Sequence, residues 1–109
     1  MNGWIGVDLD GTLAEYHGWK GIEHVGDPVP KMLARVRNWL ASGQPVRIVT
    51  ARVGGQDSNE ARIYIERWCK VHLGCVLPVT CSKDFEMIEL WDDRCVQVLP
   101  NTGERVDGE

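Results

Sequence analysis

Two aspartates one residue apart, Asp8 and Asp10, end the first apolar run of the sequence, WIGVDLDGTL (residues 4–13). If the strand continues through them, both carboxylates point the same way, because side chains alternate with a period of two. Like charges that close repel each other and are costly to bury without a positive partner. A hard divalent cation such as Mg²⁺ is such a partner, so the pair predicts a metal-dependent site.

Other polar side chains follow the later apolar runs. Magnesium prefers a few carboxylates, several waters and a phosphate oxygen, and threonine and lysine add hydrogen-bond donors for further oxygens. This set suits phosphoryl transfer, in which a carboxylate can also act as the nucleophile. Taken singly, each residue has a plainer explanation as a turn, a strand end or a surface charge. These polar residues are Thr50, which ends the run at 45–50, Lys83, which follows the run at 75–80, and Asp92 and Asp93, which follow the run at 87–91.

Strand and helix patterns alternate along the chain. The first helix is predicted to begin with Asp27 as N-cap and Pro28 in its first turn, and to end at Gly43. A second helix is predicted from Asp57 or Ser58 to Leu73, with Gly74 as its stop. Their apolar stripes are Met32, Leu33, Val36 and Leu40, and Ala61, Ile65, Trp68 and Cys69.

This order of elements predicts an α/β fold, a Rossmann-like parallel β-sheet with flanking helices. In such sheets ligands bind beyond the carboxyl ends of the strands. The polar residues that end the apolar runs are therefore expected at one rim of the sheet, although they lie far apart in the sequence.

Four segments, VDLDGTL, IVTAR, SKD and LWDDR, resemble the motifs of the haloacid dehalogenase-like (HAD) hydrolase superfamily in its phosphatase branch. The resemblance spans about residues 4–95. It implies that Asp8 is the nucleophile that attacks phosphorus. It also implies that Asp10 is the general acid and base, with its main-chain carbonyl reaching the metal.

The resemblance assigns roles to further residues. Thr50 would bond a phosphoryl oxygen, and Lys83 would steady the nucleophile and the transferred group. Asp92 would ligate Mg²⁺, with Asp93 as an alternate or outer ligand. The residues expected near the substrate are Gly11, which turns the chain, Thr12, which bonds back to that turn, and Arg52, either a second phosphate anchor or a surface salt bridge.

An aspartate at position 10 favours a phosphomonoester hydrolase over a dehalogenase, because an alkoxide leaving group needs a proton and a halide does not. The substrate is then a small phosphorylated molecule. A nucleotidase or a polynucleotide 3′-phosphatase of the same fold is the alternative enzyme. From another class, a phospho-accepting receiver domain or a non-catalytic phosphate-binding module is the alternative. A receiver carries its aspartate on the third strand, where CVLPVT has none.

The chain leaves no room for the cap domain that most members of the superfamily carry. The stretch at residues 14–26, AEYHGWKGIEHVG, is too short for one, so the site is expected to be open. Within it, Trp19 could stack on a base or sugar while Lys20 meets a phosphate. We expect Trp19 instead to pack down on the small core, because packed tryptophans outnumber exposed ones.

The 109 residues predict one domain, 1–109, with a polar tail from about residue 100. The net charge of −4 and the absence of a basic block disfavour a nucleic-acid partner. No run approaches the roughly 20 apolar residues of a membrane span, and the start lacks a signal-peptide pattern. We therefore expect a cytoplasmic protein with four reduced cysteines, without the spacing of a zinc site.

The resemblance also places the fourth strand beside the first. Right-handed crossovers then put both predicted helices on one face of the sheet. The return at residues 82–87 is too short for a helix, since such a crossover usually takes about a dozen residues. The opposite face would be thinly covered, by this return and the tail. We expect a second copy of the chain to cover it, as a homodimer.

Overall fold

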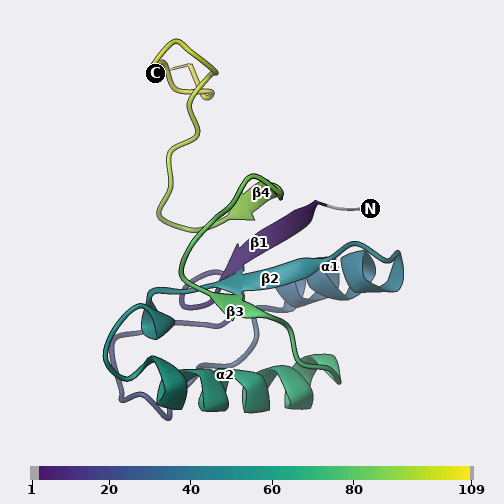
Figure 1. Cartoon of the computed structure of the whole chain (residues 1–109), viewed down its shortest axis with the longest axis vertical. Helices are drawn as coiled ribbons and strands as arrows, with labels where there is room; N and C mark the ends of the chain where they lie inside the picture. Colours follow the sequence, from purple (N-terminus) through teal and green to yellow (C-terminus); the bar gives the residue numbers. More distant parts are fainter. Residues whose placement is uncertain (1–2, 109) are drawn as a thin grey trace.

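The structure is a computed structural model that describes residues 3–108. It contains one sheet in which four strands run parallel in the order β3-β2-β1-β4, with two α-helices (Figure 1). The predicted α/β class is confirmed, with β4 beside β1 as expected. The elements are β1 (Trp4–Asp8), α1 (Pro30–Ala41), β2 (Val46–Val49), a short 3-10 helix η1 (Ala51–Val53), α2 (Ser58–Leu73), β3 (Val79–Thr80) and β4 (Met87–Trp91).

Both helices pack on the same face of the sheet. Ile5 and Val7 of β1 are in register with Val46 and Ile48 of β2, and these side chains join the helices in one buried core. Their burial removes apolar surface from water and is the main driving force for this arrangement. The residues that the helices bury are Met32, Leu33 and Val36 from α1, and Ala61, Ile65, Trp68 and Cys69 from α2.

Helix α1 begins two residues later than the sequence predicted, at Pro30 with Val29 as its N-cap. The predicted cap is used elsewhere, because the Asp27 carbonyl accepts a hydrogen bond from Glu15 N and Pro28 bridges to Ala14. The start of α2 at Ser58 and its end at Gly74 are confirmed, and Gly74 takes the left-handed conformation with φ +78°.

One predicted strand is shortened, and the tail forms little regular structure. The run at 75–80 pairs only over Val79–Thr80, since Pro78 has no N–H to donate to a neighbouring strand. The tail, described as far as residue 108, forms a single antiparallel bridge between Val98 and Arg105 around a turn. It extends away from the sheet without joining it (Figure 1).

The other face of the sheet has little cover. Trp4 is buried there because its indole N–H donates to Asp84 Oδ1 at 2.8 Å and the Arg47 guanidinium lies 4.4 Å from its ring. Ile88 and Leu90 of β4 stay 54% and 37% exposed. The return segment thus protects one end of this face, as expected, while the tail leaves the rest open. Among residues 3–108, no helix is long and apolar enough to cross a membrane.

The open face generates a prediction about assembly. We predict that the chain forms a homodimer at micromolar concentration, because pairing this face would bury Ile88 and Leu90. Light scattering should give twice the chain mass, and Ile88→Lys should shift the protein towards monomer. Val71→Lys is the matched control, since Val71 is also exposed but lies on α2. A wild-type monomer under the same conditions would refute the prediction.

Candidate active site

Of the polar residues expected at one rim of the sheet, Asp8, Thr50, Asp92 and Asp93 do meet there. Asp8 is the last residue of β1, Thr50 directly follows β2, and Asp92 directly follows β4. Because the strands are parallel, their carboxyl ends open into one cleft of about 770 Å³. The cleft is lined by Asp8, Asp10, Tyr16, Trp19, Val49, Thr50, Ala51, Arg52, Cys81, Asp92, Asp93 and Arg94.

Three carboxylates form a cluster in this cleft. Asp8, Asp92 and Asp93 each offer an oxygen, and the three oxygens lie within 4.8 Å of one another. So much like charge in one place favours a bound cation, and a set of carboxylate oxygens fits Mg²⁺. The expected grouping of Asp8 with Asp92 is thus observed, and Asp93 is a member of the same cluster. The carboxylate of Asp10 is not.

The turn after β1 holds the cluster together. The Thr12 hydroxyl accepts a hydrogen bond from Asp93 N at 3.0 Å, and its proton can go to Asp8 Oδ2 at 3.3 Å or Asp93 Oδ1 at 3.2 Å. Gly11 has φ +91°, and a Cβ there would lie 2.5 Å from Asp93 Oδ2. Gly11 and Thr12 therefore shape the acidic cluster, and their expected position beside the substrate stays a prediction.

The surroundings of Asp8 disfavour its charge in the absence of a cation. Burial, as the largest cause, together with the hydrogen bond to Asp93 and the charges of Asp92 and Asp93, raises the pKa of Asp8 to about 7. A neighbouring cation would act in the opposite direction and favour the carboxylate. Asp8 is thus a carboxyl group whose charged form would be favoured by a bound positive charge.

Asp10 has a different positive partner from the one the sequence suggested. Its two oxygens accept from Nε and Nη2 of Arg52, both at 2.8 Å, in a bidentate pair. The Arg52 side chain is only 6% exposed, so the expected surface salt bridge is instead a largely buried one. The chain reverses after β1, and this turn separates the carboxylate of Asp10 from the cluster around Asp8.

Thr50 lies at the back of the cleft and is 3% exposed. Its Oγ1 accepts a hydrogen bond from Arg52 N at 3.2 Å, which begins η1. Accepting that bond leaves the hydroxyl proton available to donate, as the predicted contact with a phosphoryl oxygen requires.

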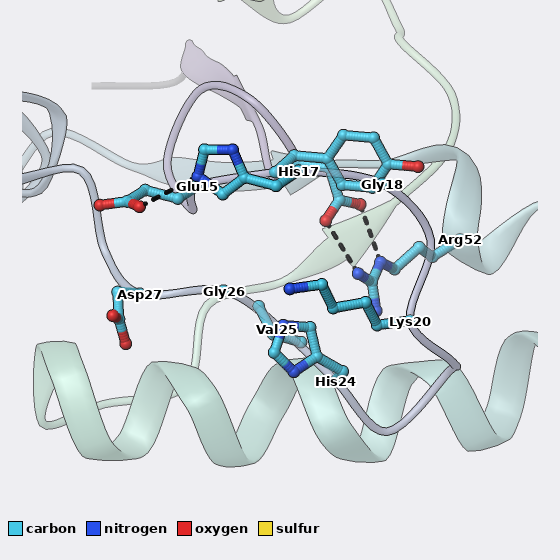
Figure 2. A pocket seen from close by; sticks show the side chains of 11 residues that line it. Glu15, His17, Gly18, Lys20, His24, Val25, Gly26, Asp27 and Arg52 are labelled. Carbon is cyan, nitrogen blue, oxygen red and sulfur yellow. Dashed lines mark hydrogen bonds and ion pairs between the residues drawn. The ribbon is translucent and has the colours of Figure 1, made fainter.

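The two predicted lysines lie outside the lining of the cleft. Lys83 is exposed, so the structure does not bring it to Asp8 as the sequence predicted. Lys20 lines a neighbouring cavity of about 170 Å³, on whose wall Figure 2 shows it with His24 and Arg52. The cations that line the cleft are Arg52 and Arg94, and the sequence analysis had not selected Arg94. Its position directly after the Asp92–Asp93 pair was the available signal.

Trp19 does not pack on the core as predicted. It is 60% exposed and lines the cleft, whereas Ala14, Ile22 and Val25 are the residues of this loop that pack in or against the core. Gly18 and Gly21, with φ +108° and +104°, turn the chain on either side of Trp19. The Arg52 guanidinium lies 4.9 Å from its ring centre. Tyr16, which the sequence analysis also passed over, lines both cavities.

Comparisons with known proteins support the fold alone. Neither a family model nor a curated protein matches the chain. Among solved structures, a conserved protein from Bacteroides thetaiotaomicron matches with a TM-score of 0.59 and 20% sequence identity. The match covers 89% of this chain and 80% of that protein. This α/β parallel-sheet fold is therefore found in another protein.

The raised pKa of Asp8 predicts how stability depends on pH. The folded state holds this proton up to about pH 7 and the unfolded state only up to about pH 4, so the group destabilises the fold progressively as pH rises between them. In EDTA, the unfolding midpoint of wild type should therefore fall more from pH 5 to pH 8 than that of Asp8→Asn. Adding Mg²⁺ should raise the wild-type midpoint more at pH 8 than at pH 5.

Asp107→Asn is the matched control, because Asp107 is exposed in the tail. This variant should follow the wild-type profile. If the unfolding midpoints of wild type and Asp8→Asn change with pH in parallel, the pKa of Asp8 is not raised in the folded state.

Proposed function

We propose that the protein is a Mg²⁺-dependent phosphomonoester hydrolase of the HAD type that works through an aspartyl-phosphate at Asp8. The observation that carries the proposal is one cleft in which Asp8 belongs to a three-carboxylate cluster while Asp10 and Thr50 line the same space. Its four free cysteines suit the reducing cytoplasm, where we propose that it acts.

In the first half-reaction, an Asp8 oxygen forms a bond to phosphorus as the bond from phosphorus to the leaving oxygen breaks. Asp10 gives its proton to that oxygen, so that an alcohol departs. In the second half, a water oxygen attacks phosphorus, Asp10 takes up a proton from the water, and the bond to Asp8 breaks. Phosphate leaves, and both aspartates return to their starting states.

The other residues supply position and charge. Asp8, Asp92 and Asp93 would hold Mg²⁺, which neutralises negative charge around the transferred phosphoryl group when it is bound. The Thr50 hydroxyl would donate to a phosphoryl oxygen from its buried position. Arg94, in the lining of the cleft, is a second cation available to the phosphoryl group. A role for Lys83 stays a prediction, and it would require the exposed segment at 81–86 to move towards Asp8.

Arg52 couples substrate binding to the state of Asp10. Both oxygens of Asp10 accept hydrogen bonds from Arg52, so an Asp10 that carries a proton for the leaving oxygen must give up at least one of these contacts. Oxygens of a bound phosphate ester would compete for the same N–H groups. The Asp10–Arg52 pair is therefore expected to loosen when substrate enters, which makes proton donation dependent on occupancy.

The first test is turnover of p-nitrophenyl phosphate. Wild type should hydrolyse it with Mg²⁺ and lose the activity in EDTA, while Asp8→Asn should fall at least about a thousandfold in kcat because the nucleophile is gone. Asp107→Asn should retain wild-type kinetics. Metal-independent hydrolysis, or an Asp8→Asn protein as active as wild type, would overturn the proposal.

A second test concerns the proton that Asp10 supplies. Asp10→Asn should lower kcat for an alkyl phosphate by roughly 10²- to 10⁴-fold, since an alkoxide is a poor leaving group without protonation. The loss for p-nitrophenyl phosphate should be clearly smaller, because p-nitrophenolate leaves readily. Equal losses for the two esters would remove Asp10 from the acid role.

A further inference from the structure

We propose that Trp19 and Tyr16, which both line the cleft, form a stacking platform for a nucleobase, so that the substrate is a phosphorylated nucleoside. The inference rests on the proposed phosphatase function and names the class of its substrate. It assigns a binding role to the loop at residues 14–26, which takes the place of a cap domain in this chain.

The first support is the placement of the two aromatic rings. Trp19 and Tyr16 are 60% and 46% exposed, yet both line the cleft that contains Asp8 and Asp10. Large aromatic side chains left open inside a concave site are suited to contact a flat ligand. The cleft, at about 770 Å³, has the size of a typical small-molecule site and can hold a mononucleotide.

The second support is the link between the platform and the catalytic groups. The Arg52 guanidinium lies 4.9 Å from the Trp19 ring centre and is paired with both oxygens of Asp10 at 2.8 Å. The Arg52 guanidinium therefore lies between the Trp19 ring and the carboxylate of Asp10, the proposed donor of the proton to the leaving oxygen. In a nucleotide, the sugar separates the base from that oxygen by a comparably short span.

The third support is that the loop is already held in place. Glu15 N donates to the Asp27 carbonyl at 2.8 Å, and the indole N–H of Trp68 donates to the Gly26 carbonyl at 2.8 Å. Arg52 reaches the middle of the loop through the Ile22 carbonyl at 3.4 Å. A platform fixed before binding loses little conformational entropy when the ligand arrives.

The charges of the loop favour a base over a second phosphate. The smaller cavity carries Lys20 and Arg52, but Glu15 and Asp27 line it as well, and Arg52 is neutralised by Asp10 (Figure 2). This mixture of positive and negative side chains does not favour the binding of a second phosphate group. The aromatic rings in the cleft, by contrast, offer a contact that every nucleobase can use.

The experiment compares two esters that differ only in the base. For wild type, kcat/KM should be at least about tenfold higher for adenosine 5′-monophosphate than for ribose 5-phosphate, since stacking on an aromatic side chain is worth about this much. Trp19→Ala should reduce this preference to about twofold or less, whereas Trp19→Phe should keep most of it. Phe85→Ala is the control, because Phe85 is fully exposed and is not in the lining of the cleft.

Two arms distinguish the sources of such a nucleotide. Turnover of nucleoside 5′- and 3′-monophosphates is compared with that of a single-stranded oligonucleotide bearing a 3′-phosphate. A higher kcat/KM for the oligonucleotide assigns the platform to strand ends, and a higher value for a mononucleotide assigns it to free nucleotides. In either case the preference must depend on Trp19.

Calorimetry separates failure of this inference from failure of the proposed function. The Asp8→Asn protein should bind adenosine 5′-monophosphate about tenfold more tightly than ribose 5-phosphate, and Asp8→Asn/Trp19→Ala should bind the two equally. This binding measurement does not require the protein to hydrolyse the ester. Equal affinities for the two esters in Asp8→Asn, or a preference that persists without Trp19, would overturn the platform even if the protein is a phosphatase.

Discussion

The repulsion among Asp8, Asp92 and Asp93 is the constraint on which the site depends. Their oxygens gather within 4.8 Å because two neighbouring parallel strands end side by side, and the Thr12 hydroxyl holds them there. Such an arrangement opposes folding unless a cation or a proton offsets it, and the raised pKa of Asp8 expresses that cost. The acidic cluster is thus a place where the fold gives up stability that a bound cation could restore.

A second electrostatic arrangement, separate from the first, organises another part of the cleft lining. Arg52 holds Asp10 through two hydrogen bonds, lies over the ring of Trp19 and reaches the Ile22 carbonyl. One side chain thus joins the proposed acid to the loop that lines the substrate space. These contacts give the cleft some preorganisation before any ligand binds.

The sequence was sufficient for the sheet, the helix faces and the rim, because each follows from local periodicity and from the geometry of parallel strands. It predicted the approach of Asp8 and Asp92 across most of the chain for the same reason. It could not assign the partner of Asp10, since Arg52 is 42 residues away and only the tertiary fold brings it near. The exposure of Trp19 could not be predicted from the sequence either, because it depends on Ile22 and Val25 packing against the core instead of Trp19. The segment that carries Lys83 has no periodicity that would aim its side chain.

The most direct measurement is a crystal structure of the protein grown with Mn²⁺, a magnesium substitute that is visible by its anomalous scattering. The account predicts one ion at roughly 2.1 Å from an oxygen of Asp8 and from an oxygen of Asp92 or Asp93, with the Asp10 carboxylate outside its ligand shell. A crystal in which Mn²⁺ binds elsewhere, while these three carboxylates stay together without a cation, would contradict it.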